Sequence, residues 1–169
     1  IGTGSVGMRL QQDGTELQVG GWGFNIGDEG GGAWLGQQLV RELLWQLDWQ
    51  RPLTPLLQAV ATHCGSDIAS ILPWLKQAKA TDFATLAPLV YQFDEPLAQQ
   101  LQLRQAQAIS ELALCSLAAQ PLPLVLLGGL ANKCQHFLNE SLRKQLQPAK
   151  GDALAGGLAL AAKLAASSY

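Results

Sequence analysis

The chain has 169 residues, the length of one average domain. Lys and Arg number 11 and Asp and Glu number 13, and this near-neutral balance excludes the concentrated positive charge of a nucleic-acid-binding surface. Hydrophobic residues make up 48% of the chain, which is enough for a core and excludes an intrinsically disordered protein. Charged residues reach only 14%, against about 25% in ordinary soluble domains, and we interpret the deficit as a sign that a partner or a second lobe covers part of this chain.

The first elements are predicted to be strands. Residues 5–10 and 15–19 form two candidate strands, and Asp13-Gly14 between them is typical of a hairpin turn. A glycine-rich loop follows over residues 20–32. From Leu35 onward leucines recur every four residues, which predicts an amphipathic helix with its apolar side toward the core. Trp34, Trp45 and Trp49 follow this stripe loosely, and we expect them in the core.

Three further helices are predicted in the middle of the chain. Pro52 and Pro55 precede a short helix that runs through Ala61 and ends before Gly65. The next helix is capped by Ser66 or Asp67. A long helix then begins near Pro96, whose fixed φ angle suits a first helical turn.

Residues 112–132 carry no charge and are long enough to cross a bilayer. Gln120, Pro121 and Pro123 interrupt this stretch, so we interpret it as a helix end followed by a short buried strand, residues 124–127, and expect no membrane contact.

The C-terminal part is predicted to hold two helices. Asn132 is a candidate N-cap for the first, whose apolar residues lie within 137–146. Asp152 caps the second, residues 153–166, which is so rich in Ala and Leu that we expect packing on most of its sides. Its Gly156-Gly157 pair indicates close approach of another backbone or a ligand. The order of elements predicts a single mixed α/β domain.

Three glycine-rich segments are candidates for ligand binding. Gly2-Thr3-Gly4-Ser5 combines bare backbone with hydroxyls, a composition that suits phosphate oxygens as well as plain turns. In the second, residues 20–32, glycines flank Trp22, which can offer its face to a sugar ring, and Asp28 can accept hydrogen bonds from sugar hydroxyls. The alternative is that Trp22 is a core aromatic and Asp28 caps the following helix.

The third segment, Gly128-Gly129, follows the predicted strand and precedes a helix, an arrangement that can admit a nucleotide or form a tight turn. This third segment carries neither a GxGxxG fingerprint nor a GxxxxGK[ST] loop. The pairs His63-Cys64 and Cys134…His136 fit no standard zinc spacing, so we predict no metal site on protein ligands. The three cysteines are too few for a disulfide framework and indicate a reducing, cytoplasmic location.

Together GTGS, GGWG, GDEG, the LGG before a helix, and GDALAGGLALA resemble the C-terminal lobe of the amino-sugar kinases. These are the glucosamine and N-acetylglucosamine kinases of the BadF/BadG/BcrA/BcrD-type ATPase family, within the actin-like ATPase and sugar-kinase superfamily. The likeness runs from Gly2 to about Ala162. It implies an α/β, ribonuclease H-like (actin-like ATPase) lobe with a mixed sheet flanked by helices. Residues 1–169 would be the C-terminal lobe of a two-lobe kinase, with the N-terminal lobe and part of the first strand outside this chain.

The resemblance also implies an activity and its residues. The reaction is phosphorylation of glucosamine or N-acetylglucosamine at the 6-hydroxyl by ATP with Mg²⁺. The implied contacts are Gly2, Thr3 and Gly4 with the phosphates, Ser5, Val6, Gly21, Trp22, Gly23 and Asp28 with the sugar, and Gly128, Gly129 and Lys133 with the adenosine.

The family's catalytic Asp would precede Ile1, so the resemblance implies that this chain alone is inactive, because phosphoryl transfer needs a closed cleft. An activator ATPase of a dehydratase or reductase and a non-catalytic sugar-binding sensor remain alternatives. The sequence does not choose between a free amine and an N-acetyl group on the sugar. We expect the exposed apolar surface of a lone lobe to favour association, such as a homodimer.

Overall fold

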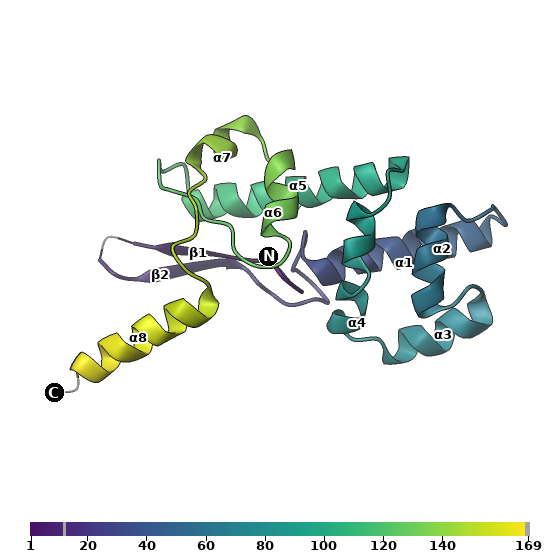
Figure 1. Ribbon diagram of the computed structural model, residues 1–169, viewed down its shortest axis with the longest axis horizontal. Helices are drawn as coiled ribbons and strands as arrows, with labels where there is room; N and C mark the ends of the chain where they lie inside the picture. Colours follow the sequence, from purple (N-terminus) through teal and green to yellow (C-terminus); the bar gives the residue numbers. More distant parts are fainter. Residues whose placement is uncertain (12, 168–169) are drawn as a thin grey trace.

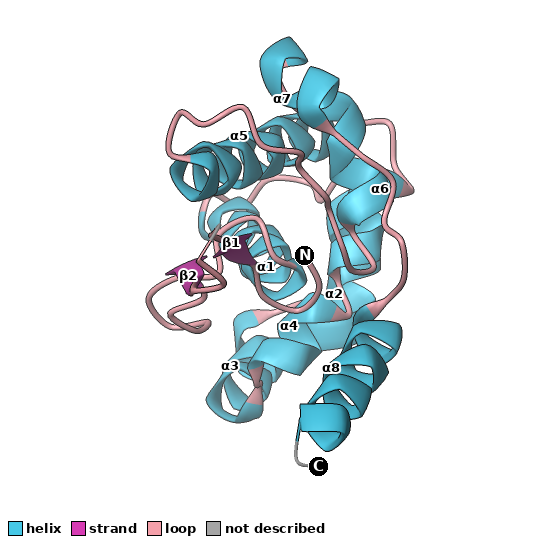
Figure 2. Ribbon diagram, turned by 90° about the vertical axis from the view of Figure 1, so that its left-hand side faces the viewer, coloured by secondary structure: helices cyan, strands magenta, loops and turns pink. Residues whose placement is uncertain are grey.

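The computed structural model describes residues 1–11 and 13–167, and its helices and one hairpin are shown in Figure 1. The elements follow in the order β1 (Val6–Leu10), β2 (Glu16–Gly20), α1 (Gly32–Asp48), α2 (Pro55–Cys64), α3 (Ile68–Gln77), α4 (Ala80–Ala84), the 3-10 helix η1 (Ala87–Tyr91), α5 (Pro96–Leu117), α6 (Ala131–Cys134), the 3-10 helix η2 (Gln135–Phe137), α7 (Glu140–Gln145) and α8 (Ala153–Ser167). Figure 2 shows how far helices and loops outweigh strands.

The predicted hairpin is confirmed. β1 and β2 pair antiparallel, with Val6 opposite Gly20 and Leu10 opposite Glu16. The Asp13 carboxylate accepts hydrogen bonds from the backbone N–H and the hydroxyl of Thr15, at 2.9 and 2.7 Å. This side chain therefore fixes the turn that sets the strand register.

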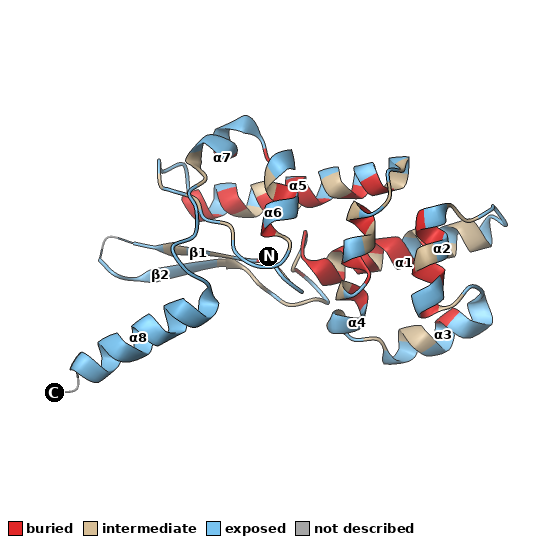
Figure 3. Ribbon diagram, viewed as in Figure 1, coloured by how far each residue is buried: buried red, intermediate tan, exposed pale blue. Residues whose placement is uncertain are grey.

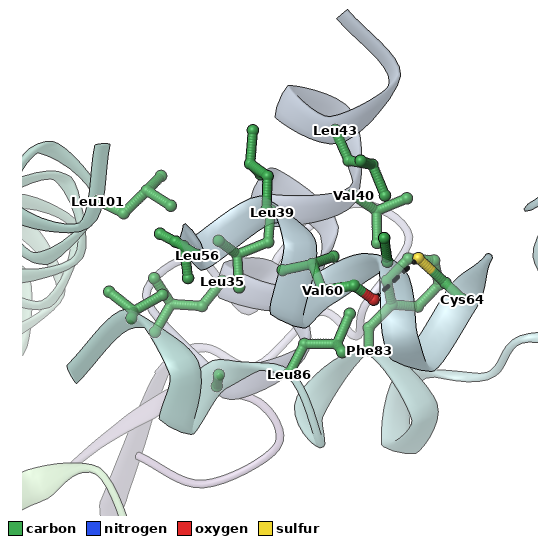
Figure 4. Packing of buried hydrophobic residues seen from close by; sticks show 14 of the residues in the cluster. Leu35, Leu39, Val40, Leu43, Leu56, Val60, Cys64, Phe83, Leu86 and Leu101 are labelled. Carbon is green, nitrogen blue, oxygen red and sulfur yellow. Dashed lines mark hydrogen bonds between the residues drawn. The ribbon is translucent and has the colours of Figure 1, made fainter. Parts of the chain in front are cut away.

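The leucine stripe of α1 faces the core as predicted. Leu35, Leu39 and Leu43 are fully buried, and they pack with α2, α4 and η1 into the larger of two apolar clusters (Figure 4). The expectation for the tryptophans was wrong for two of them, since Trp45 and Trp49 are 48% and 53% exposed and stack on each other at 5.4 Å. They occupy the flank of the stripe, where the helix surface meets solvent.

The middle helices begin close to the prolines and the capping residue that predict them. Thr54 caps α2, which runs three residues beyond the predicted end, and Asp67 rather than Ser66 caps α3. Pro96 occupies the first turn of α5. Glu95, just before it, accepts a hydrogen bond from the backbone N–H of Leu56 at 2.9 Å, which ties the start of α5 to the start of α2.

Helix α5 joins two parts of the molecule. Its first half packs into the larger cluster, and its second half contributes Ile109, Ala113 and Leu117 to a smaller cluster with α6 and α7. The hairpin lies against the same second half. A Cβ on Gly7 would lie 2.1 Å from Ser116 Oγ, so the absence of a side chain at residue 7 lets β1 approach the helix.

Several predictions for the C-terminal part were wrong. Residues 124–127 form no regular strand, and only a single parallel bridge joins Leu124 to Leu146. Asn132 lies inside α6, and Asn139 caps α7, which covers only the later part of the predicted helix. The predicted helix is divided into α6, η2 and α7, and each of these short helices contacts α5 separately. Their apolar residues therefore do not form one continuous stripe.

Helix α8 starts after Asp152, whose carboxylate accepts a hydrogen bond from the Ala155 N–H at 2.8 Å, as predicted. The expectation that it packs on most sides was wrong, because residues 153–166 are all exposed (Figure 3). A Cβ on Gly156 or Gly157 would meet no atom within 4 Å, so no close approach is seen at this pair. Among the described residues, no helix is long and apolar enough to span a bilayer.

Candidate functional site

The first glycine-rich segment lies across the start of α1. The backbone N–H groups of Gly32 and Ala33 donate to the carbonyls of Gly2 and Thr3, both at 2.8 Å. Gly2 and Thr3 themselves remain exposed on the outer side. The carbonyls of the segment therefore cap the start of the 17-residue helix α1, and its outer side presents bare backbone.

The second segment meets the first at Gly4. A Cβ on Gly4 would lie 2.3 Å from Asp28 Oδ2, and a Cβ on Gly31 would lie 2.7 Å from Gly4 Cα, so these two glycines allow both contacts. Asp28 has a left-handed backbone, with φ of 62°. Its carboxylate accepts no hydrogen bond from the described part of the chain, and the N-cap of α1 is Gly31 without a side-chain bond. Asp28 is therefore not the helix cap, and its carboxylate oxygens can accept from a ligand.

Trp22 is not a core aromatic, because its side chain is 76% exposed. The turn after it is held by a hydrogen bond from the Gly27 N–H to the Gly23 carbonyl at 2.8 Å. Phe24 anchors this turn by packing on Phe83, with ring centroids 5.2 Å apart. The turn thus rests on the core while the indole faces solvent, where it can meet a flat, partly apolar ligand.

The other residues predicted to line the sugar pocket flank Trp22 and Asp28. Ser5 is buried, and its hydroxyl donates to the Glu29 carbonyl at 2.7 Å, which holds residues 28–30 beside the first segment. A Cβ on Gly21 would lie 2.9 Å from Val6 Cγ2, so the start of β1 and the end of β2 meet here. Ser5 therefore positions the loop, and its donor is already used.

The third segment lies beside the N-terminal residue, close to α6 (Figure 1). Gly128 has φ of 101°, and a Cβ there would lie 2.4 Å from the Ile1 carbonyl oxygen. The same carbonyl accepts a hydrogen bond from the Leu130 N–H at 3.2 Å. Gly129 is exposed, with no atom within 4 Å of the place a Cβ would take. Because Ile1 adjoins Gly2, the fold brings all three segments together.

A partly buried polar chain leads from the second segment toward α6, the helix that follows the third segment. Gln105 is fully buried and donates through Nε2 to the Gly30 carbonyl at 2.8 Å, while its Oε1 accepts from the Tyr91 hydroxyl. The Lys133 ammonium lies 5.9 Å from the centre of the Tyr91 ring. Burial raises the pKa of Tyr91 to about 12, so this phenol is neutral and donates a hydrogen bond at any physiological pH.

Sequence reasoning missed Gln105 and Tyr91. A signal for Gln105 was present, because it occupies the apolar stripe of α5 midway between Leu101 and Ile109, each four residues away. A glutamine on a core-facing stripe must find hydrogen-bond partners, and here the partners are supplied by the glycine-rich loop. No comparable local pattern marks Tyr91.

The side chains that could bind a metal are scattered over the described residues. Within residues 1–11 and 13–167, no three His, Cys, Asp or Glu side chains are grouped so as to hold a metal ion. All three cysteines are free; Cys64 lies in the larger cluster and Cys134 in the smaller one, while Cys115 is exposed. Burial raises the pKa of the Cys64 and Cys134 thiols, which keeps them protonated.

The chain is similar to two curated kinases. It is 34% identical over 166 residues to glucosamine kinase GspK of Vibrio cholerae, covering 96% of this chain and 56% of the relative. It is 28% identical over 95 residues to the N-acetyl-D-glucosamine kinase of Dictyostelium discoideum, covering 54% of this chain and 30% of that protein. This chain is a homologue of the amino-sugar kinases.

A solved structure supports the same relationship. The crystal structure of a candidate N-acetylglucosamine kinase from Chromobacterium violaceum shares the fold of this amino-sugar kinase homologue, with a TM-score of 0.87 and 36% identity. The match covers 95% of this chain and 57% of that structure, so the chain spans little more than half the length of these relatives. No protein-family model matches the chain.

Proposed function

We propose that this chain is the C-terminal lobe, of ribonuclease H-like type, of an ATP-dependent kinase that phosphorylates glucosamine or N-acetylglucosamine at the 6-hydroxyl. The observation that carries the proposal is the meeting of three glycine-rich segments at Ile1, Gly4 and Asp28 in a homologue of the amino-sugar kinases. The third segment follows the second by more than 90 residues, so no local reason brings it to the other two, whereas a sugar and a nucleotide bound side by side require all three.

The surroundings of each segment support a separate role. Gly2, Thr3 and Gly4 would hold phosphate oxygens through bare backbone above the start of α1. Asp28 would accept hydrogen bonds from sugar hydroxyls, with Trp22 against the apolar face of the pyranose ring. These assignments extend to the neighbours Ser5, Val6, Gly21 and Gly23, and to Gly128, Gly129 and Lys133 on the adenosine side.

ATP would supply the phosphoryl group, and Mg²⁺, held mainly by phosphate oxygens, would neutralise its charge. This chain's own residues bind and orient the two substrates. The base that takes the proton from the sugar hydroxyl would come from the missing lobe. We therefore expect the 169-residue chain alone to form no ADP above background with hexosamine and Mg-ATP.

The alternatives find less support in this structure. An activator ATPase would need its cysteines grouped to hold an iron–sulfur cluster, but Cys64 and Cys134 are buried in separate apolar clusters. A non-catalytic sensor would leave the exposed glycines of the first and third segments without a role. The free thiols fit a cytoplasmic kinase.

The full-length protein tests this proposal through phosphorylation of both sugars. Asp28→Asn removes charge-assisted hydrogen bonds worth about 1.5–3 kcal/mol each, so we expect KM for the sugar to rise about tenfold or more. Trp22→Ala should raise the same KM. The matched controls are Asp48→Asn and Trp49→Ala, an exposed acid and an exposed indole at the far end of α1. If all four variants behave like the parent, the assignment of the sugar pocket is wrong.

A further inference from the structure

We infer that Gln105, at the centre of α5, is a positioning residue that holds the Asp28 carboxylate in place for the sugar. The inference rests on the proposed function, because it takes Asp28 as the acceptor for sugar hydroxyls. It adds a residue that acts from behind the loop, since the side chain of Gln105 is fully buried and its amide nitrogen reaches the loop at Gly30.

The loop that carries Asp28 is held by its backbone carbonyls. The carbonyls of residues 28, 29 and 30 each accept a hydrogen bond, in turn from the Gly31 N–H at 2.9 Å, the Ser5 hydroxyl at 2.7 Å and Gln105 Nε2 at 2.8 Å. The first bond is local to the turn, and the second comes from the adjoining glycine-rich segment. The third comes from a long helix, so Gln105 ties the loop to the helical core.

Asp28 needs this support because its own backbone is strained. Its φ angle of 62° lies in the left-handed region, which a residue other than glycine keeps only where its surroundings enforce it. Gly30 also has a positive φ, 79°, and a Cβ there would lie 2.8 Å from Ile109 Cδ1. The loop therefore rests directly on α5 at Gln105 and Ile109. Loss of the Gln105 bond would let the backbone of Asp28 relax and displace its carboxylate.

Tyr91 fixes which end of the Gln105 amide faces the loop. The Gly30 carbonyl can only accept, so it requires Nε2, and Oε1 of the same amide then accepts from the Tyr91 hydroxyl. Gln102 Nε2 donates to the Val90 carbonyl at 2.7 Å, which holds η1, and with it Tyr91, against α5. Tyr91 and Gln105 therefore act together on the loop.

A second buried glutamine offers a matched comparison. Gln38 on α1 is 5% exposed, and its Oε1 accepts a hydrogen bond from Arg104 at 2.9 Å, so this bond joins two helices. Gln105 instead joins a helix to the loop that carries Asp28. The two glutamines are alike in burial and chemistry and differ in what they hold, which makes Gln38 the control.

Steady-state kinetics of the full-length protein tests the inference. Gln105→Met keeps an unbranched side chain of similar length but removes its hydrogen bonds, so we expect KM for the sugar to rise about fivefold or more while kcat changes by less than about twofold. Gln38→Met should leave both constants within about twofold of the parent. A sugar KM that is the same in the two variants would overturn the inference.

A double variant separates positioning of Asp28 from a general loosening of the fold. If Gln105 acts through Asp28, Gln105→Met should raise KM by less than about twofold in a protein that already carries Asp28→Asn. The full increase in that background would show that Gln105 acts elsewhere, and the inference would fail. An Asp28→Asn protein with an unchanged KM refutes the proposed sugar contact itself, whereas an effect of Asp28→Asn without one of Gln105→Met refutes only the role of Gln105.

Tyr91→Phe provides a milder test that does not depend on the folding of Gln105→Met. It removes only the hydroxyl that orients the Gln105 amide, so we expect the sugar KM to rise about threefold, less than in Gln105→Met. If Gln105→Met does not fold, a Tyr91→Phe protein with the KM of the parent overturns the inference, and the expected increase supports it.

Discussion

The two halves of the molecule bury their apolar residues to different extents. In the helical half, formed by α1 to α4, η1 and the start of α5, leucines such as Leu35 and Leu56 are completely buried. In the sheet half, Met8 and Leu10 are more than half exposed, and every residue from 153 to 166 of α8 is exposed (Figure 3). The helical half is a finished core, whereas the sheet half presents surfaces suited to being covered by more chain.

The largest expected effect lies in the core of the helical half. Leu39→Ala should lower the free energy of unfolding by about 2–5 kcal/mol, since it removes a fully buried side chain and leaves a cavity. Met8→Ala, at a 55% exposed position in the sheet half, should change it by less than about 0.5 kcal/mol. Urea unfolding of the 169-residue chain measures both. Similar losses for the two variants would show that the halves are equally packed.

Replacing a glycine by alanine is expected to lower the stability of the helical half and to raise that of α8. A Cβ on Gly36 would lie 1.8 Å from the Phe83 carbonyl oxygen, so Gly36→Ala forces α1 and α4 apart and should cost about 1–3 kcal/mol. Gly156→Ala in α8 meets open space and should raise local helix stability by up to about 1 kcal/mol. Thermal unfolding and circular dichroism measure these effects, and a stabilising Gly36→Ala would contradict the packing described here.

A smaller effect is expected at Tyr91, between the halves. Its pKa is raised from 10.0 to about 12, so the unfolded chain loses the phenolic proton first, and stability should fall as pH rises from about 10 to 12. Tyr91→Phe should cost about 0.5–1.5 kcal/mol below pH 10 and remove this part of the pH dependence. Urea midpoints at several pH values check the sign. A parent and a Tyr91→Phe protein with the same slope would show that the phenol is not buried.

The smallest effect belongs to α8. Leu158 is 65% exposed, so Leu158→Ala should change the free energy of unfolding of the 169-residue chain by less than about 0.5 kcal/mol. In the full-length protein the same substitution should cost more, provided that additional chain covers this helix. Equal and negligible effects in both proteins would show that α8 stays uncovered.

Local signals carried most of the sequence prediction. Asp13-Gly14, Pro55, Asp67 and Pro96 each mark a turn or a helix start through their own backbone bonds or dihedral angles, and the structure has those boundaries nearby. The glycines at positions 4, 31 and 128 also stand out in the sequence, and each allows a close backbone contact. Such features depend on a few neighbouring residues and are visible without a fold.

Features that depend on contacts between residues far apart in the sequence could not be predicted. The strand expected at residues 124–127 needs neighbours along both edges, and it has a single bridge to Leu146. The composition of α8 is that of a buried helix, but burial requires a partner surface. Tyr91 and Gln105 meet only because η1 and the centre of α5 pack together, a contact that no local pattern records.

The contact of Gly4 with Asp28 has a consequence for ligand release. Since the carboxylate of Asp28 rests on the backbone of Gly4, neither loop can shift without displacing the other. Occupancy on one side of this contact would therefore alter the free energy of occupancy on the other, and by thermodynamic linkage the alteration is mutual. Two ligands held by these loops would therefore change each other's dissociation constants by the same factor.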